Sequence, residues 1–96
     1  MLNQVIMVAR CSKIENNNDV TTLEVKVQRT FKNDNGEYDV DTISCNLIGH
    51  LASNTKEYLE VGNLIGIKGH LEECNGILTV IAEKITFLSS KKEEDK

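Results

Sequence analysis

The feature that most constrains the fold of this chain is an alternation of apolar and polar residues that ends in a tight turn. The alternation runs from Val20 to Phe31, and its apolar members are Leu23, Val25 and Val27. Alternation with a period of two predicts a strand with one buried face. Asn33–Gly36 follows, and Asn and Gly tolerate the positive φ of a hairpin turn. Glu37–Ile48 then returns as a second strand, so the centre of the chain is predicted to be a β-hairpin.

The flanking segments also have strand character. Three further strands are predicted, over Val5–Ala9, Asn63–Leu71 and Ile77–Leu88. In the second of these, Ile65, Ile67 and Leu71 share one face. Gly66 and Gly69 in the same segment indicate sharp curvature or a close backbone approach. The first strand leads into a polar loop, Glu15–Asp19, and Cys74–Gly76 is predicted to be a tight turn.

A single helix is predicted between the third and fourth strands. Leu51, Thr55, Tyr58 and Leu59 recur at helical spacing, so the helix is expected over Ala52–Glu60 and to end at Gly62. Five strands with one short helix in this position are typical of an all-β, five-stranded Greek-key barrel, the OB fold. Residues 1–88 are expected to form this domain, and the charged segment 89–96 to be a disordered tail.

The charge, the hydropathy and the cysteine spacing of the chain limit which classes of function are expected. The 96 residues carry a net charge of −4, with no apolar run long enough to span a membrane and no secretory signal, so a cytoplasmic location is expected. The positive charge is uneven: residues 1–32 sum to +2 and residues 33–96 to −6. A phosphate-binding surface would therefore use the N-terminal third. Cys11, Cys45 and Cys74 lack metal-site spacing and are expected to be reduced packing or surface residues, so no metal or cofactor is expected.

Several motifs in order resemble the bacterial and phage single-stranded DNA-binding protein (SSB) family. They are Met1–Arg10, Val27–Glu37 with its Arg-Thr-Phe-Lys centre, Gly49–Ala52, Glu57–Leu59 and Gly62–Leu71. No single motif is specific, but their order and spacing together are. The resemblance covers roughly residues 1–88 and implies sequence-nonspecific binding of single-stranded DNA in replication, recombination or repair. It also implies a homotetramer, or else a homodimer, joined through the first strand.

The resemblance and the residue types together give a set of candidate contacts with DNA. Cations would hold phosphates, and flat rings would stack on bases. The phosphate candidates are Arg10, Lys26, Arg29, Lys32 and Lys68, with His50 and His70 as weaker ones because histidine is mostly neutral near pH 7. Phe31 aligns with a stacking aromatic of the family. Tyr38 could stack on a base or could be a cross-strand partner that stabilises the turn.

Three departures from the family pattern weaken the predicted site. Two positions that usually carry rings hold Thr42 and Ile48, and the hairpin before the last strand is reduced to Glu72–Gly76. The remaining rings, Tyr58 and Phe87, are expected in the core. The chain also ends without the family's apolar tip that recruits replication and repair proteins, which puts such partners in doubt. Binding is therefore expected to be weak per protomer and strongly salt-dependent.

Two other classes of function compete with the binding of single-stranded DNA. An enzyme is not expected, because the sequence has no Ser/His/Asp or Cys/His arrangement at recognisable spacing and no phosphate-cradling glycine loop. The second alternative is an OB domain that has exchanged DNA binding for protein interaction or assembly, as in primosomal accessory proteins, which resemble this family. The few rings and the acidic balance favour this alternative, and the retained Arg29–Lys32 cluster opposes it.

Overall fold

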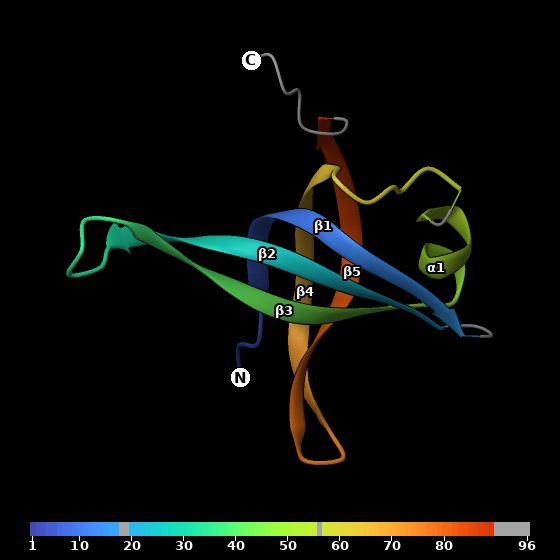
Figure 1. Cartoon of the computed structure of the whole chain (residues 1–96). Coiled ribbons are helices and arrows are strands. Elements are labelled where there is room, and N and C mark those ends of the chain that lie inside the picture. Colours follow the sequence, from blue (N-terminus) through green and yellow to red (C-terminus); the bar gives the residue numbers. More distant parts are fainter. Residues whose placement is uncertain (18–19, 56, 90–96) are drawn as a thin grey trace.

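The computed structural model describes residues 1–17, 20–55 and 57–89, and it has the predicted all-β architecture. Five strands form a closed barrel in the order β1-β2-β3-β5-β4. One short helix, α1, lies between β3 and β4 in the chain. The elements are β1 Val5–Asn17, β2 Val20–Lys32, β3 Tyr38–Ile48, α1 His50–Thr55, β4 Leu64–Cys74 and β5 Ile77–Ser89 (Figure 1). The prediction of an OB fold is confirmed.

One long strand, β1, closes the barrel. Its first half, from Val5 to Arg10, pairs antiparallel with β4, and its second half, from Arg10 to Asn17, pairs antiparallel with β2. The register shifts between Cys11 and Lys13, where an irregularity bends the strand from one neighbour to the other. The sequence predicted a short strand over Val5–Ala9 and a polar loop over Glu15–Asp19. The strand instead continues to Asn17, because its pairing with β2 continues through polar residues, and residues 18–19 lie outside the described ranges.

The core is built from the alternating residues that the sequence indicated. Leu23 and Val25 of β2 and Ile65 and Ile67 of β4 are all at most 1% exposed. Cys11 and Cys45 lie in the same cluster as free thiols. Burial, with a smaller contribution from the neighbouring Cys11, raises the pKa of the Cys45 thiol to about 11, so it stays protonated at neutral pH. Both residues act as small apolar side chains, as expected.

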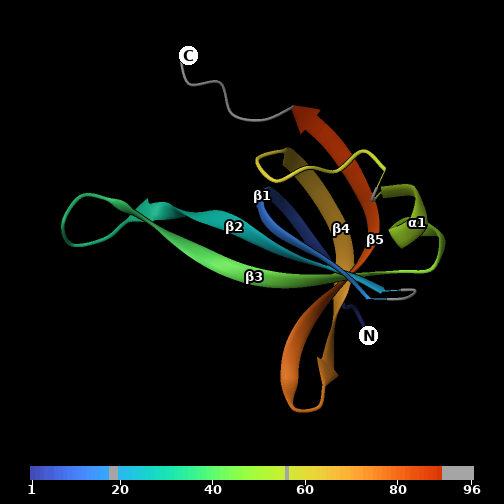
Figure 2. The same cartoon turned by 45° about the vertical axis from the view of Figure 1, so that its right-hand side comes forward.

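Two hairpins project from the barrel in different directions (Figures 1 and 2). The β2–β3 hairpin turns at Asn33–Gly36, as predicted. The side-chain oxygen of Asn33 accepts hydrogen bonds from the backbone N–H groups of Asn35 and Glu37, and Gly36 has a φ of 79°. The β4–β5 hairpin turns at Asn75–Gly76 and pairs up to Cys74 and Ile77. It is a protruding arm, although the sequence led us to expect a reduced loop.

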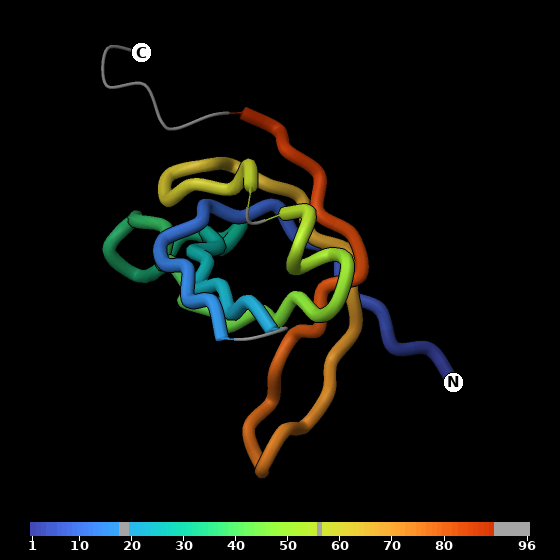
Figure 3. The backbone as a smooth tube through the Cα atoms, turned by 90° about the vertical axis from the view of Figure 1, so that its right-hand side faces the viewer, coloured from blue at the N-terminus to red at the C-terminus, as the bar shows by residue number. Residues whose placement is uncertain are grey.

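The helix is shorter than predicted, and this changes the environment of two rings. The helix α1 ends at Thr55, and its buried side chains are Ala52 and Thr55. It lies beside one open end of the ring of strands (Figure 3). Leu59 enters the core, but Tyr58 is 64% exposed and Phe87 is 43% exposed. The expectation that both rings are core residues is wrong, because the helical stripe does not continue to Tyr58 and because Phe87 lies near the end of β5.

No helix in the described ranges is long and apolar enough to cross a membrane. The charged segment expected to form a tail begins with Ser89, which is the last residue of β5; residues 90–96 lie outside the described residues.

The predicted close approach occurs at Gly69. The pairing of β4 with β5 shifts between Lys68 and Gly69, where Glu83 is an extra residue in β5. A Cβ at Gly69 would lie 2.1 Å from the backbone oxygen of Ile81, whereas a Cβ at Gly66 would meet nothing nearer than 3.8 Å. The barrel therefore bends at a position that only glycine fits.

We expect Gly69→Ala to lower the free energy of unfolding by about 1–3 kcal/mol, because the methyl group must displace backbone. Gly66→Ala is the matched control on the same strand and should change this free energy by much less. Urea unfolding of both variants measures the difference. Equal stability of the two variants would contradict the close approach.

Candidate nucleic-acid interface

The β2–β3 hairpin carries most of the predicted contact residues. Its outer face follows from the register, because Lys26 is opposite Thr42, Gln28 is opposite Val40, and Lys32 is opposite Tyr38. These pairs alternate with the inward-facing core residues of the same strands. The sequence prediction that β2 presents cations and a ring at its far end is consistent with this arrangement.

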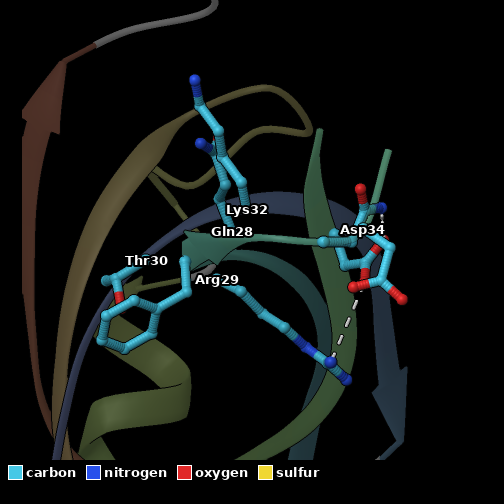
Figure 4. Close-up of a pocket in the computed structure, with 8 residues that line it drawn as sticks. Gln28, Arg29, Thr30, Lys32 and Asp34 are labelled. Carbon is cyan, nitrogen blue, oxygen red and sulfur yellow. Dashed lines mark hydrogen bonds and ion pairs between the residues drawn. The ribbon is translucent and has the colours of Figure 1, made fainter. Parts of the chain in front are cut away.

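Phe31 is the most exposed ring of the chain, at 84%. It lies where the β2–β3 pairing is irregular: β2 has the three residues Arg29–Phe31 between two pairs that are separated in β3 by Asp39 alone. Irregularities of this kind re-aim side chains next to binding sites. The ring borders a surface hollow that Gln28, Arg29, Lys32 and Asp34 also line (Figure 4). An exposed ring beside cations is the arrangement that a base-stacking site needs.

Tyr38 is the cross-strand partner of Lys32. The Lys32 ammonium nitrogen lies 5.9 Å from the centroid of the Tyr38 ring, within the range of a cation–π contact. Tyr38 is still 46% exposed. Tyr38 therefore has a cross-strand partner, which is Lys32 and not Phe31, and its ring keeps enough free surface to touch a base as well.

Arg29 is engaged by two carboxylates. Its Nε and Nη2 donate to the two carboxylate oxygens of Asp41 at 3.0 and 2.9 Å. Its Nη1 lies 3.9 Å from Asp39, an ion pair that is dashed in Figure 4. The bidentate hydrogen bonds to Asp41 raise the pKa of Arg29, and the same bonds lower the pKa of Asp41. The sequence analysis proposed Arg29 as a phosphate ligand, but here its charge is balanced within the hairpin.

The remaining cations are distributed over other parts of the molecule. Lys26 donates to the Thr42 hydroxyl at 2.8 Å and stays on the outer face of the hairpin. Arg10 of β1, opposite Lys26, donates through Nη1 to the backbone oxygen of Gly62 at 3.0 Å. His50 opens α1, at the end of β3 away from the hairpin turn. Lys68 lies in β4 opposite Lys84. Lys26, Phe31, Lys32 and Tyr38 therefore lie on the β2–β3 hairpin, and these other cations do not.

His70 is held between two carboxylates. Its Nε2 lies 2.7 Å from Glu72 and its Nδ1 lies 2.6 Å from Glu83. The hydrogen bonds to Glu72 and then Glu83 raise the pKa of His70. The sequence analysis considered His70 a weak phosphate ligand, but the two acids around it make this cluster net negative even when the ring is charged. No cluster of three or more His, Cys, Asp or Glu side chains in the described part of the chain is arranged to hold a metal ion.

An apolar groove between the two hairpins escaped the sequence analysis. It is lined on one side by Thr42 and Ser44 of β3 and on the other by Leu71, Ile77 and Leu78 of the β4–β5 arm. Ile77 and Leu78 are each 68% exposed. The signal in the sequence was the pair of adjacent aliphatic residues directly after Asn75–Gly76, since a strand half-buried on one face would alternate there.

The fold and this surface define a class of protein: a small OB barrel with a ring and cations on a projecting hairpin. A model described as "Single-strand binding protein family" matches residues 2–76. The chain is 31% identical to single-stranded DNA-binding protein B of Bacillus subtilis, over 98% of this chain and 96% of that protein. The chain belongs to the single-strand binding protein family. Several other curated relatives of the same description are longer, and the chain spans 62% to 64% of their length.

Solved structures agree on the fold. The PriB protein of Ralstonia solanacearum superposes with a TM-score of 0.69 at 14% identity, over 91% of this chain and 98% of that one. A small single-stranded DNA binding protein from Mycoplasma pneumoniae gives 0.66 at 21% identity, over 97% and 99%. At these identities the likeness concerns the barrel alone.

We expect NMR titration to give His70 a pKa above the ordinary value of about 6.5. Glu72→Gln should lower that pKa, because it removes the larger of the two interactions that favour the imidazolium. Glu73→Gln, on the same strand but without a contact to His70, is the control. Since the folded-state pKa is raised, the His70 ion pairs stabilise the fold fully below about pH 6.5 and lose this effect as pH rises through the raised pKa. An unchanged His70 pKa in Glu72→Gln would contradict the assignment.

Proposed function

We propose that this protein binds single-stranded DNA without sequence preference, with the outer face of the β2–β3 hairpin as its primary contact. The observation that carries the proposal is the 84% exposure of Phe31, which lines a surface hollow on this hairpin together with Lys32. Base stacking on an aromatic ring is tolerant of sequence because every base has a π-face. Lys26 and Lys32 supply positive charge for phosphates on the same hairpin. Membership of the single-strand binding protein family supports the proposal.

The proposed strength of binding follows from the charges and rings. Arg29 is neutralised by Asp41 and Asp39, so few cations remain for phosphates on this face. At position 42, which usually carries a ring in the family, Thr42 has a hydroxyl group that cannot stack on a base. Each missing ring lowers the stacking contribution to the free energy of binding by roughly 1–3 kcal/mol per base. The aliphatic groove that Leu71, Ile77 and Leu78 line is the surface against which further bases would pack. We therefore propose weak binding per protomer, in the cytoplasm, with a role in replication, recombination or repair.

Phe31→Ala should weaken binding of a labelled dT oligomer of about 35 nucleotides by roughly 5-fold to 150-fold, the equivalent of about 1–3 kcal/mol. Phe31→Trp is the control, since it keeps a ring and should bind at least as well as the wild type. Fluorescence anisotropy at low and moderate salt measures both, and the wild-type affinity should fall steeply with salt. A Phe31→Ala affinity equal to that of the wild type would overturn the stacking assignment.

We further propose that the chain assembles into a homodimer or homotetramer through β1. Residues Val5–Ala9 are hydrogen-bonded to β4 on one edge, and pairing with β2 begins only at Arg10. The other edge of Val5–Ala9 therefore faces no strand among the described residues. Ile6 and Val8 are 75% and 57% exposed on this segment, which has no proline or lysine to block pairing with another chain.

Assembly would present several weak sites to one DNA strand and so raise the overall affinity. Sedimentation at tens of micromolar should give the mass of two or four chains, and Ile6→Lys should shift the protein toward the monomer. Val40→Lys is the control, because it places the same charge at a residue that is 53% exposed on β3, away from β1. A monomeric wild type would defeat the assembly proposal and leave the DNA-binding proposal standing.

A further inference from the structure

Two of the four aromatic rings of this chain form an exposed pair away from the projecting hairpin. Tyr58, in the loop after α1, and Phe87, near the end of β5, lie edge to face with centroids 6.2 Å apart. Their exposed fractions are 64% and 43%. Edge-to-face contact fixes the orientation of both rings but still leaves a large part of the Tyr58 ring open. An exposed, oriented ring of this kind is not explained by core packing.

The pair borders a surface hollow with polar walls. The hollow is lined by Tyr58, Glu60, Asn63, Phe87, Leu88 and Ser89. The Asn63 side chain is fixed, because its oxygen accepts a hydrogen bond from the Glu60 backbone N–H at 2.8 Å. The mixture of flat rings, an amide and a serine resembles a nucleotide-binding surface more than a purely aliphatic docking face.

A cation stands next to this hollow. Arg10 donates through Nη1 to the oxygen of Gly62, the residue before Asn63. This is the one side-chain hydrogen bond that Arg10 makes within the described ranges, so its other guanidinium N–H groups can reach a phosphate. The Arg10 side chain is thereby held beside the hollow and not on the β2–β3 hairpin. The negative charge of Glu60 would repel a phosphate placed directly over the rings. The backbone of a bound nucleic acid would therefore pass on the side of the hollow where Arg10 lies.

The register connects the hollow to the proposed DNA contact. Lys26 of β2 lies opposite Arg10 of β1, Arg10 lies opposite Leu64 of β4, and Leu64 lies opposite Ser89 of β5. These pairs make one row across the barrel surface, from the hairpin that carries Phe31 to the hollow beside Tyr58. Two cations in this row, Lys26 and Arg10, are neighbours.

We propose that Tyr58 and Phe87 form a second base-stacking site, reached by the same DNA strand after it crosses β1 along Lys26 and Arg10. This inference rests on the proposed binding of single-stranded DNA and adds a site that the hairpin does not contain. The Tyr58 ring stacks on the base, Phe87 orients the Tyr58 ring, and Arg10 contacts the adjoining phosphate. A short strand would reach only the site at Phe31, and a longer strand would also reach the site at Tyr58. The affinity for DNA is therefore expected to rise in two steps as the strand becomes longer.

The test is a length series of labelled dT oligomers, from about 6 to about 35 nucleotides, which brackets the span of one OB barrel. Tyr58→Leu keeps apolar volume but removes the ring. It should leave the affinity for the shortest oligomers unchanged and weaken binding of the longest by about fivefold or more. Tyr58→Phe is the matched control and should bind like the wild type at every length. Phe31→Ala should weaken binding at all lengths.

A second measurement does not depend on affinity. Oligomers that contain 5-iodouracil, irradiated in complex with the wild type, should cross-link to peptides containing Phe31 and, for long oligomers, to the peptide containing Tyr58. Long-oligomer binding by Tyr58→Leu at wild-type strength, or cross-links confined to Phe31, would overturn the second site alone. Failure of the wild type to bind any oligomer at low salt would overturn the proposed function and this inference together. Because Tyr58 is exposed, circular dichroism of Tyr58→Leu should show an intact fold.

Discussion

The two-sided pairing of β1 is the interaction on which the rest of the structure depends. Its second half pairs with β2 and its first half with β4, so one continuous strand joins the two hairpins into a closed barrel. Closure brings the apolar faces of all five strands around one core, which an open pair of hairpins of this size would not bury. The bend of β4 and β5 at Gly69 is part of the same closure, since the two strands approach there more closely than any side chain allows.

The barrel also determines which side chains of the projecting β2–β3 hairpin are exposed. Once Leu23, Val25 and their neighbours are buried, the far ends of β2 and β3 extend beyond the core and expose both faces. One face carries Lys26, Lys32 and Tyr38, and the other carries Arg29 paired with Asp41. Two of the acidic side chains, Asp39 and Asp41, are thus paired with Arg29 within the hairpin. Because Asp39 and Asp41 lie against Arg29 on one face, Lys26 and Lys32 on the other face can present a locally positive contact surface on a chain with net negative charge.

Prediction from sequence succeeded where the signal was local. The hairpin at Asn33–Gly36 and the alternating core residues follow from turn chemistry and a period of two. The sequence indicates curvature or a close approach at both Gly66 and Gly69, and the structure shows the close approach at Gly69. It failed where a boundary depended on partners distant in sequence. Polar residues up to Asn17 became strand because β2 supplied hydrogen bonds, and α1 stopped at Thr55 despite a continuing apolar spacing. Arg29 and His70 were proposed as phosphate contacts, but their carboxylate partners on neighbouring strands could not be inferred from composition.

The sequence by itself determined the class of fold, the family and the alternating core residues of β2 and β4, because periodicity, turn residues and motif order are properties of the chain alone. The tertiary structure alone decided which charged and aromatic side chains are available. Whether a cation is free or paired, and whether a ring is buried or open, depends on the register between strands that the sequence does not fix residue by residue. The exposure of Tyr58 and Phe87, the engagement of Arg29 and the placement of Arg10 at Gly62 are consequences of that register.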